Sequence, residues 1–357
     1  MTDKNTAIAA PRTARVPFWD NARFVAVTLV VIGHGIQRLT ADSDPALSIY
    51  LFIFAFHMPA FAMISGYFSK SDPPNRQQLT KVITDILLPY LIMEFIWSVV
   101  KYLVEGKVDF NPTTASWTLW FLLALAIFRL ILPYLALVKW PLLWAVVASV
   151  GVGFYANVDS TFSLARAIAI LPFFVLGWKL REIGLMDRWM SAGGRLVWWV
   201  RGAGAIVLGG WLVVALVFIE PFREFRLARW FFFDLGYQAL GQGEWWAGFA
   251  RLGFLLLAVV LSAALFALVP RSTTWFTDLG QATMYVYLLH TFVLYPIRES
   301  GVLGGEHSSI LWLVSMIVAS IAISIALASP LVRRVFRPLI EPKPRWLFRE
   351  VGAASSR

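Results

Sequence analysis

The stretch DNARFVAVTLVVIGHGIQRL, residues Asp20 to Leu39, decides the class of fold. Its middle, Phe24 to Ile32, is apolar enough to lie in lipid, yet an arginine stands at one end and a histidine well inside. At about 100° and 1.5 Å per residue, Arg23 and His34 share one helix face and lie roughly 16 Å apart. Ionisable groups on a membrane helix face a polar interior rather than lipid. The stretch therefore predicts a membrane-spanning helix with a polar, inward-facing side.

The composition of the whole chain agrees with a membrane protein. The 357 residues are 59% hydrophobic and 15% charged, with a mean hydropathy of +0.69, whereas a soluble domain needs more polar residues to cover its surface. Cys is absent, which excludes disulfides and cysteine nucleophiles. The net charge of +10 comes from basic residues scattered between apolar segments. That pattern favours membrane topology, so no nucleic-acid partner is expected.

Ten apolar segments are long enough to be membrane helices, since about 20 residues cross the hydrocarbon core. The sequence therefore predicts an all-α, polytopic integral membrane protein with about ten transmembrane helices and no separate soluble domain. The expected spans are 22–40, 46–68, 82–104, 118–137, 140–156, 167–181, 200–219, 248–269, 279–300 and 309–332.

The distribution of basic residues predicts the topology. Ten spans put both termini on one side of the membrane, and most of the 31 Lys and Arg residues then fall on that side. The positive-inside rule makes it the cytoplasmic side. The expected parts are a cytoplasmic N-terminal segment at 1–20, a transmembrane domain at 21–332 and a basic cytoplasmic tail at 333–357. The tail is typical of an anchor on anionic lipid.

The longest external connection holds EPFREFRLARWFFFDLGYQALGQGEWW, residues 220–246. Its aromatic residues and the arginines at three-residue steps, among them Arg223 and Arg226, predict an interfacial amphipathic helix. Such a segment either rests on lipid headgroups or takes part in binding a substrate. Both readings stay open.

Two further histidines lie in predicted spans. His57 stands two residues before Pro59, which removes a backbone hydrogen bond to the Ala55 carbonyl and bends the helix beside the imidazole. His290 lies in the middle of the ninth span, with Tyr287 three residues before it. A histidine beside a broken helix either packs against the freed backbone or takes part in chemistry.

The residues alone leave more than one function open. Asp20 lies where it would cap the first helix, and it is three residues from Arg23, so a local ion pair is the simpler reading of those two. No HExxH-like spacing or acidic cluster accompanies the intramembrane histidines, so no metal is expected. Ionisable residues in broken membrane helices also build proton relays and substrate paths. An enzyme and a proton-coupled transporter of a small molecule or glycolipid are therefore both candidates.

Five motifs, taken in order, resemble one family. DNARFVAVTLVVIGH carries an arginine, ten residues and a histidine, and FHMPAFAMISGY follows in the second span. LWFLLAL, RAIAILPFFVLGW and LGQATMYVYLLH come later. Together they are similar to the motifs of the membrane acyltransferase-3 family, in particular its fucose 4-O-acetylase-like branch. Thr283 stands where the family's late motif has serine, a departure that keeps the hydroxyl.

The resemblance implies an enzyme of the bacterial plasma membrane that moves an acyl group, usually acetyl, from acyl-CoA to a hydroxyl of an envelope carbohydrate or glycolipid. Acetyl-CoA is then a donor substrate, and no bound cofactor is expected. His34 would take the acceptor proton, with His57 and His290 in the same catalytic site. Arg23, with Asp20 beside it, would hold the CoA phosphates. The roughly 16 Å between Arg23 and His34 is comparable with the length of the pantetheine arm.

The acceptor side is less defined. Arg223, Arg226 and Tyr287 are the expected substrate contacts, and the acceptor stays open among an exopolysaccharide, a lipid-linked sugar and a glycolipid such as a trehalose mycolate. Direct transfer and an acyl-His34 intermediate also stay open. The expected partners are acyl-CoA, this carbohydrate or glycolipid acceptor, and membrane lipids. The five ordered motifs and the lack of a visible half-repeat favour the enzyme over the transporter.

Overall fold

The computed structural model describes residues 15–106, 110–303 and 307–348. Within these ranges every regular element is a helix, which confirms the predicted all-α class. Residues 1–14 of the expected N-terminal segment and residues 349–357 of the expected tail lie outside the described residues.

The helices follow one another closely along the chain. The first half holds α1 Pro17–Ile36, α2 Asp44–Phe54, α3 His57–Tyr67, α4 Arg76–Val82, α5 Leu88–Glu105, α6 Trp120–Leu135, α7 Pro141–Val152 and α8 Leu164–Glu182. The second half holds α9 Leu185–Ser191, α10 Gly194–Val217, α11 Ile219–Glu224, α12 Leu227–Phe231, α13 Ala247–Leu268, α14 Thr283–Glu299, α15 Ile310–Leu327 and α16 Pro330–Ile340. Short 3₁₀ helices are η1 Gln37–Ala41, η3 Thr161–Ser163, η4 Asp278–Ala282 and η5 Arg345–Leu347, and η2 Ile83–Leu87 is a π-helix.

Seven helical segments of the described chain are long and apolar enough to cross a membrane. Each of the ten expected spans coincides with a helix, but α6 and α7 are short apolar helices and α14 is 17 residues long. The seven segments support the predicted membrane-protein class, whereas the count of ten crossings is not confirmed. The seven segments are Pro17–Ala41, Asp44–Tyr67, Arg76–Glu105, Thr161–Glu182, Gly194–Val217, Ala247–Leu268 and Ile310–Leu327.

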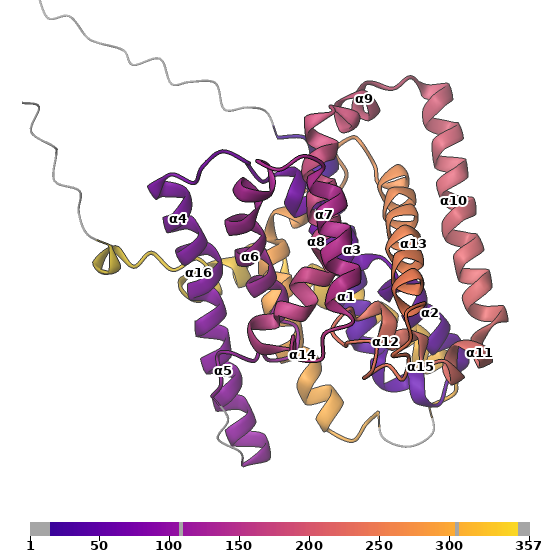
Figure 1. Ribbon diagram of the computed structural model, residues 1–357. Helices are drawn as coiled ribbons and strands as arrows, with labels where there is room; N and C mark the ends of the chain where they lie inside the picture. Colours follow the sequence, from indigo (N-terminus) through magenta and orange to yellow (C-terminus); the bar gives the residue numbers. More distant parts are fainter. Residues whose placement is uncertain (1–14, 107–109, 304–306, 349–357) are drawn as a thin grey trace, which may run out of the picture.

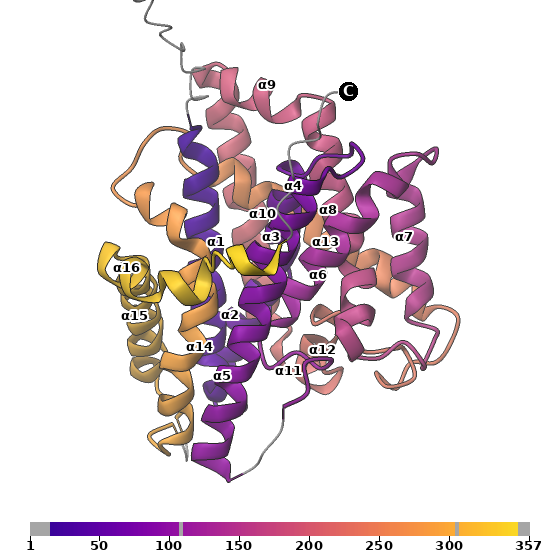
Figure 2. The ribbon, with the colours of Figure 1, turned by 90° about the vertical axis from the view of Figure 1, so that its left-hand side faces the viewer.

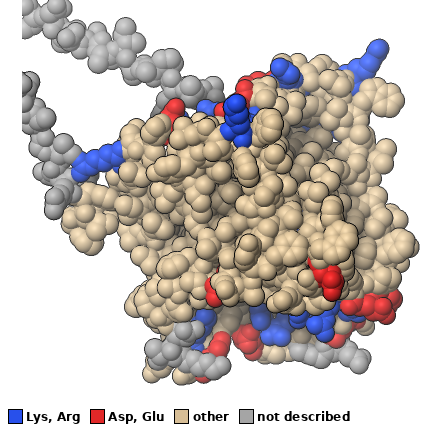
Figure 3. All heavy atoms as spheres, viewed as in Figure 1, with Lys and Arg blue, Asp and Glu red and all other residues tan. Residues whose placement is uncertain are grey.

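Charged side chains gather at two opposite ends of the molecule. Figure 3 shows an uncharged band between these ends on the face in view. In Figure 1, α9 and the start of α4 lie at one end, and α11 and α12 lie at the other. Two charged ends with an uncharged band between them agree with helices that cross a bilayer.

Helix α1 lies inside the bundle rather than at its edge. Most of its residues are buried, and it packs against α3, α14, α15 and η4, as Figure 2 allows the reader to follow. The contact with η4 is so close that a Cβ on Gly280 would collide with the Asp20 carbonyl. The expected cap at Asp20 is wrong, because α1 begins at Pro17, whose ring fits the first helical turn, and Asp20 lies inside that turn.

The second span is broken into α2 and α3, as Pro59 predicts. The break lies at Ala55 and Phe56, and Phe56 leaves the helical region with φ −145° and ψ −14°. His57 begins α3 directly after the break. The bend therefore places this imidazole beside backbone carbonyls in the middle of the bundle.

The long external connection folds differently from the single amphipathic helix expected. It forms two short helices, α11 and α12, that are separated at Arg226, whose φ is +52°. The residues directly after α12 pack into the bundle, with Phe233 and Tyr237 buried, whereas Trp245 and Trp246 before α13 are exposed. This segment therefore closes one end of the bundle instead of lying flat along it.

Candidate active site

The three intramembrane histidines come together from α1, α3 and α14. His34 lies in the last turn of α1, and its ring centroid is 5.5 Å from that of His290. His57 joins the cluster through Phe54, which contacts both His57 and His34 with ring centroids 4.6 and 6.0 Å away. The Tyr287 ring lies 6.2 Å from His290. The fold thus joins four of the residues selected from the sequence.

Two of these histidines have a fixed tautomer. His57 Nδ1 lies 2.9 Å from the Ile53 carbonyl, and His290 Nδ1 lies 3.0 Å from the Val286 carbonyl. Since a carbonyl oxygen only accepts hydrogen bonds, each Nδ1 carries the proton and donates it. Nε2 of each neutral ring is then an acceptor. His57 thus packs against backbone at the helix break, as one of the two expectations held. Its Nε2 is not used in this contact and can accept a hydrogen bond.

The contact between His34 and His290 leaves two polar atoms unsatisfied. Nδ1 of His34 and Nε2 of His290 are both buried without a hydrogen-bond partner in the protein. The two nitrogens belong to neighbouring rings but are not hydrogen-bonded to each other, and a His34 that carries its proton on Nδ1 would offer a donor to the acceptor nitrogen of His290. That tautomer makes Nε2 of His34 the basic nitrogen. Buried polar groups are usually paired, so two unpaired nitrogens on neighbouring rings are candidates for contact with a ligand.

Two cavities meet at His34. The small cavity, of about 200 Å³, extends one helical turn toward Arg23, as far as Val30 of α1, and His57 and Tyr287 also line it. The large cavity, of about 410 Å³, extends from His34 in the other direction along the chain, beside η1 and the end of α14. Both are lined by His34, Gln37, Tyr50, Trp117 and Phe232.

Trp117 forms a wall that both cavities share. Its backbone has a φ of +46°, a left-handed conformation that is costly for an aromatic residue. The ring packs edge-on against His34 at 5.8 Å, and the Arg298 guanidinium lies 5.2 Å from it. The Tyr287 hydroxyl donates to the carbonyl of Thr118, the next residue. The strained turn therefore holds an indole against the imidazole, and the hydroxyl of Tyr287 supports that turn.

The sequence did not select Arg166 and Asp234, which also line the small cavity. Arg166 lies in the first turn of α8, donates to the Asp234 carboxylate and stacks on Trp120, with its guanidinium carbon 4.4 Å from the ring. The available signal was position, since Arg166 opens the RAIAILPFFVLGW motif. Asp234 carried no signal, because it lies 68 residues further along in an irregular segment.

Arg23 and Asp20 lie at the other end of α1. Arg23 donates to Asp20 over 3.1 Å, and its guanidinium lies 4.5 Å from the Phe68 ring. The local ion pair anticipated from the spacing is therefore present. Arg23 lines neither cavity, and its contact with a donor stays a prediction.

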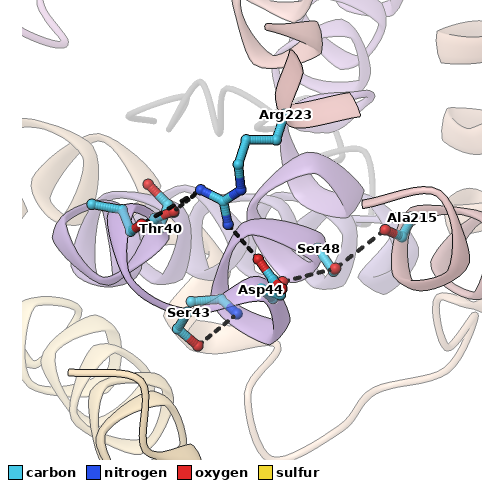
Figure 4. A network of polar contacts seen from close by, with 8 residues as sticks. Thr40, Ser43, Asp44, Ser48, Ala215 and Arg223 are labelled. Atoms are coloured by element: carbon cyan, nitrogen blue, oxygen red, sulfur yellow. Dashed lines mark hydrogen bonds and ion pairs between the residues drawn. The ribbon is translucent and has the colours of Figure 1, made fainter. Parts of the chain in front are cut away.

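Arg223 and Arg226 also lie outside both cavities. The Arg223 guanidinium points between Thr40 and Asp44 in Figure 4, where it pairs with the Asp44 carboxylate and donates to the Thr40 carbonyl over 3.2 Å. These bonds fasten α11 to η1 and α2. Arg226 is exposed at the start of α12. Their role in binding an acceptor stays a prediction.

A histidine that lines two cavities between membrane helices, with a second histidine ring packed beside it, suits a base that acts where two substrates meet. Comparison with known proteins agrees: the chain matches the Acyltransferase domain family over residues 16–329. It therefore belongs to the membrane acyltransferase-3 family.

One curated relative extends this match. The chain is similar to the nodulation protein NolL of Mesorhizobium japonicum, with 26% identity over 353 residues that cover 87% of this chain and 86% of the relative. No solved structure matches this chain at a significant level. The family match and this relative together identify the protein as a membrane acyltransferase.

Proposed function

We propose that this protein is an O-acetyltransferase of the bacterial plasma membrane that moves acetyl from acetyl-CoA to a hydroxyl of an envelope carbohydrate or glycolipid. The observation that carries the proposal is His34, which lines both cavities and packs against His290 with an unsatisfied nitrogen on each ring, in a chain of this family. Acyl transfer to a hydroxyl needs a base of this kind, because an alcohol is a weak nucleophile until its proton is removed.

His34 is the proposed base. Its Nε2 takes the hydroxyl proton while the acceptor oxygen forms a bond with the thioester carbonyl carbon. The carbon–sulfur bond then breaks, and the leaving thiolate takes the proton back from His34. His290 holds the required tautomer, because its Nε2 can accept from Nδ1 of His34 while its own Nδ1 donates to the Val286 carbonyl.

The two cavities suit two substrates. The small cavity reaches from Phe231 of α12 past His34 to Val30, one turn toward the Arg23 end of α1, and most of its lining is apolar or aromatic, which suits the acyl end of the donor. The large cavity includes Arg38, Thr40 and Arg298 at the other end of the molecule, which suits a polar acceptor. Arg23 lies about 16 Å from His34 along α1 and is the proposed contact for the CoA phosphates.

Further basic residues lie near Arg23, at the end of α1 where the donor is proposed to bind. Phe68, which lies under the Arg23 guanidinium, also lines a pocket of about 360 Å³. Lys70 and Lys81 line the same pocket. A cluster of cations beside Arg23 supports binding of an anionic nucleotide there.

The experiment that tests this function compares cells with the gene, without it, and with a His34→Gln allele. Envelope lipids and polysaccharides from each strain are analysed by mass spectrometry. We expect one species that carries an additional acetyl group only in the strain with the parental gene. A species that differs in abundance across the membrane but not in mass would favour the transporter instead.

A further inference from the structure

The small cavity has a charged wall as well as its histidines. Arg166 and Asp234 face this cavity together, from α8 and from the segment after α12. Their side chains are only 19% and 28% exposed. Within the pair, Nε of Arg166 and Oδ1 of Asp234 are buried without a hydrogen-bond partner in the protein. Each member of the pair therefore keeps one unsatisfied polar atom.

A second arginine lies behind Asp234. Arg251 of α13 is 1% exposed, and its guanidinium lies 5.1 and 5.5 Å from the rings of Phe233 and Tyr237. It donates to the Leu235 carbonyl over 3.3 Å, and two of its nitrogens have no partner. Two guanidinium groups therefore flank one segment that supplies one carboxylate.

This arrangement leaves a positive charge in excess among largely buried side chains. Burying such a charge is costly unless a negative group offsets it. Acyl transfer creates a negative charge briefly, on the carbonyl oxygen of the thioester. Donors placed in advance around that oxygen are among the largest contributions to catalysis of this kind.

We propose that Arg166 is a catalytic residue that donates hydrogen bonds to the thioester oxygen as it becomes an oxyanion. The inference rests on the proposed function. When the acceptor oxygen bonds to the carbonyl carbon, the electron pair of the C=O bond moves onto oxygen, next to Arg166. The electron pair then re-forms the C=O bond as the carbon–sulfur bond breaks. The leaving thiolate takes up the proton that His34 removed from the acceptor. Asp234 is a positioning residue that fixes the guanidinium.

A purely structural role is the competing explanation, because Arg166 also joins α8 to the segment after α12. Arg271 offers a matched control from the opposite end of the molecule. Its guanidinium also stacks on a tryptophan, 5.2 Å from Trp189, and donates to the Trp189 carbonyl over 2.7 Å. Loss of Arg271 removes similar packing without touching either cavity.

The test uses membrane vesicles from cells that lack the gene and carry the parental protein, Arg166→Gln, Arg166→Lys, Asp234→Asn or Arg271→Gln. Radiolabelled acetyl-CoA is added, and transfer of label to the lipid and polysaccharide fractions is measured per amount of protein. Because the acceptor need not be identified, the parental protein alone decides the proposed function. Absence of labelled product with the parental protein overturns both proposals.

If the parental protein is active, we expect Arg166→Gln to lower kcat by about 100-fold or more, the loss typical of one oxyanion donor. The KM for acetyl-CoA should change little. Lys should restore part of kcat because it returns the charge without the fork of donors. Asp234→Asn should lower kcat less, and Arg271→Gln should lower thermal stability without lowering kcat. Parental kcat in Arg166→Gln, or losses in proportion to those of Arg271→Gln, would show that Arg166 is structural.

Discussion

The two ends of α1 differ in how completely their polar groups are paired. At the Arg23 end, Asn21 donates to the Pro270 and Ser272 carbonyls and accepts from two threonine hydroxyls, with all four distances between 2.7 and 3.1 Å. At the His34 end, Nδ1 of His34 and Oε1 of Gln37 are buried without a partner. One helix thus has a saturated end and an unsaturated end.

This difference separates two roles within one sequence motif. A fully paired asparagine fixes the helix against its neighbours, whereas unpaired groups beside cavities remain available to a ligand. Substitution of Asn21 should therefore act on stability, and substitution of His34 should act on catalysis. Two substitutions test this contrast, and two more test the expected contacts of Arg23 and Arg223.

The largest effect is expected for His34→Gln. The amide keeps a similar size and polarity but cannot take the acceptor proton, so kcat should fall by about 100-fold or more. The thermal midpoint should stay near the parental value, because Gln is similar in size and keeps a polar group at this position. Acetyl transfer by the purified protein near the parental rate would rule out His34 as the base.

Asn21→Leu should destabilise the protein by about 2 kcal/mol, because two backbone carbonyls and two hydroxyls lose their partner. Thermal unfolding in detergent measures the change, with Asn111→Leu as the control at an exposed loop position. The kcat of the folded fraction should be nearly parental. A stable variant with low kcat would contradict the division between the two ends.

Arg23→Ala should weaken binding of acetyl-CoA about tenfold, as expected when one charge-assisted hydrogen bond to a phosphate is lost. Arg23→Lys should recover part of the affinity, since it keeps the charge. Titration with CoA and dephospho-CoA shows which phosphate is involved. If the affinity for both is unchanged, Arg23 serves only its ion pair with Asp20.

Arg223→Gln should have the smallest effect. The side chains of Arg223 and Asp44 are 34% and 49% exposed, so their ion pair should contribute about 0.5 kcal/mol or less to stability. As a contact for the acceptor, Arg223 would affect only the KM for that substrate. A fall in kcat would place Arg223 closer to the reacting groups than its position outside both cavities indicates.

The sequence predicted those features that depend on local pattern. Apolar length identified the helices, Pro59 identified the break before α3, and helical spacing put Arg23 and His34 on one side of α1. Features that arise from tertiary contacts escaped it. The pairing of Arg166 with Asp234 and the left-handed Trp117 depend on segments distant in the chain, and neither leaves a periodic signal. The number of crossings was uncertain for a related reason, since α6 and α7 are short and apolar length alone does not define a span.

The central claim is that donor and acceptor reach His34 from opposite ends of α1. It is tested most directly in sealed vesicles of known orientation, with acetyl-CoA confined to one side and the acceptor membrane fraction to the other. With the N-terminus on the cytoplasmic side, we expect product only when acetyl-CoA is on that side, next to Arg23, and the acceptor is on the side of α11 and α12. Product formed only when both substrates share the cytoplasmic side would contradict this account.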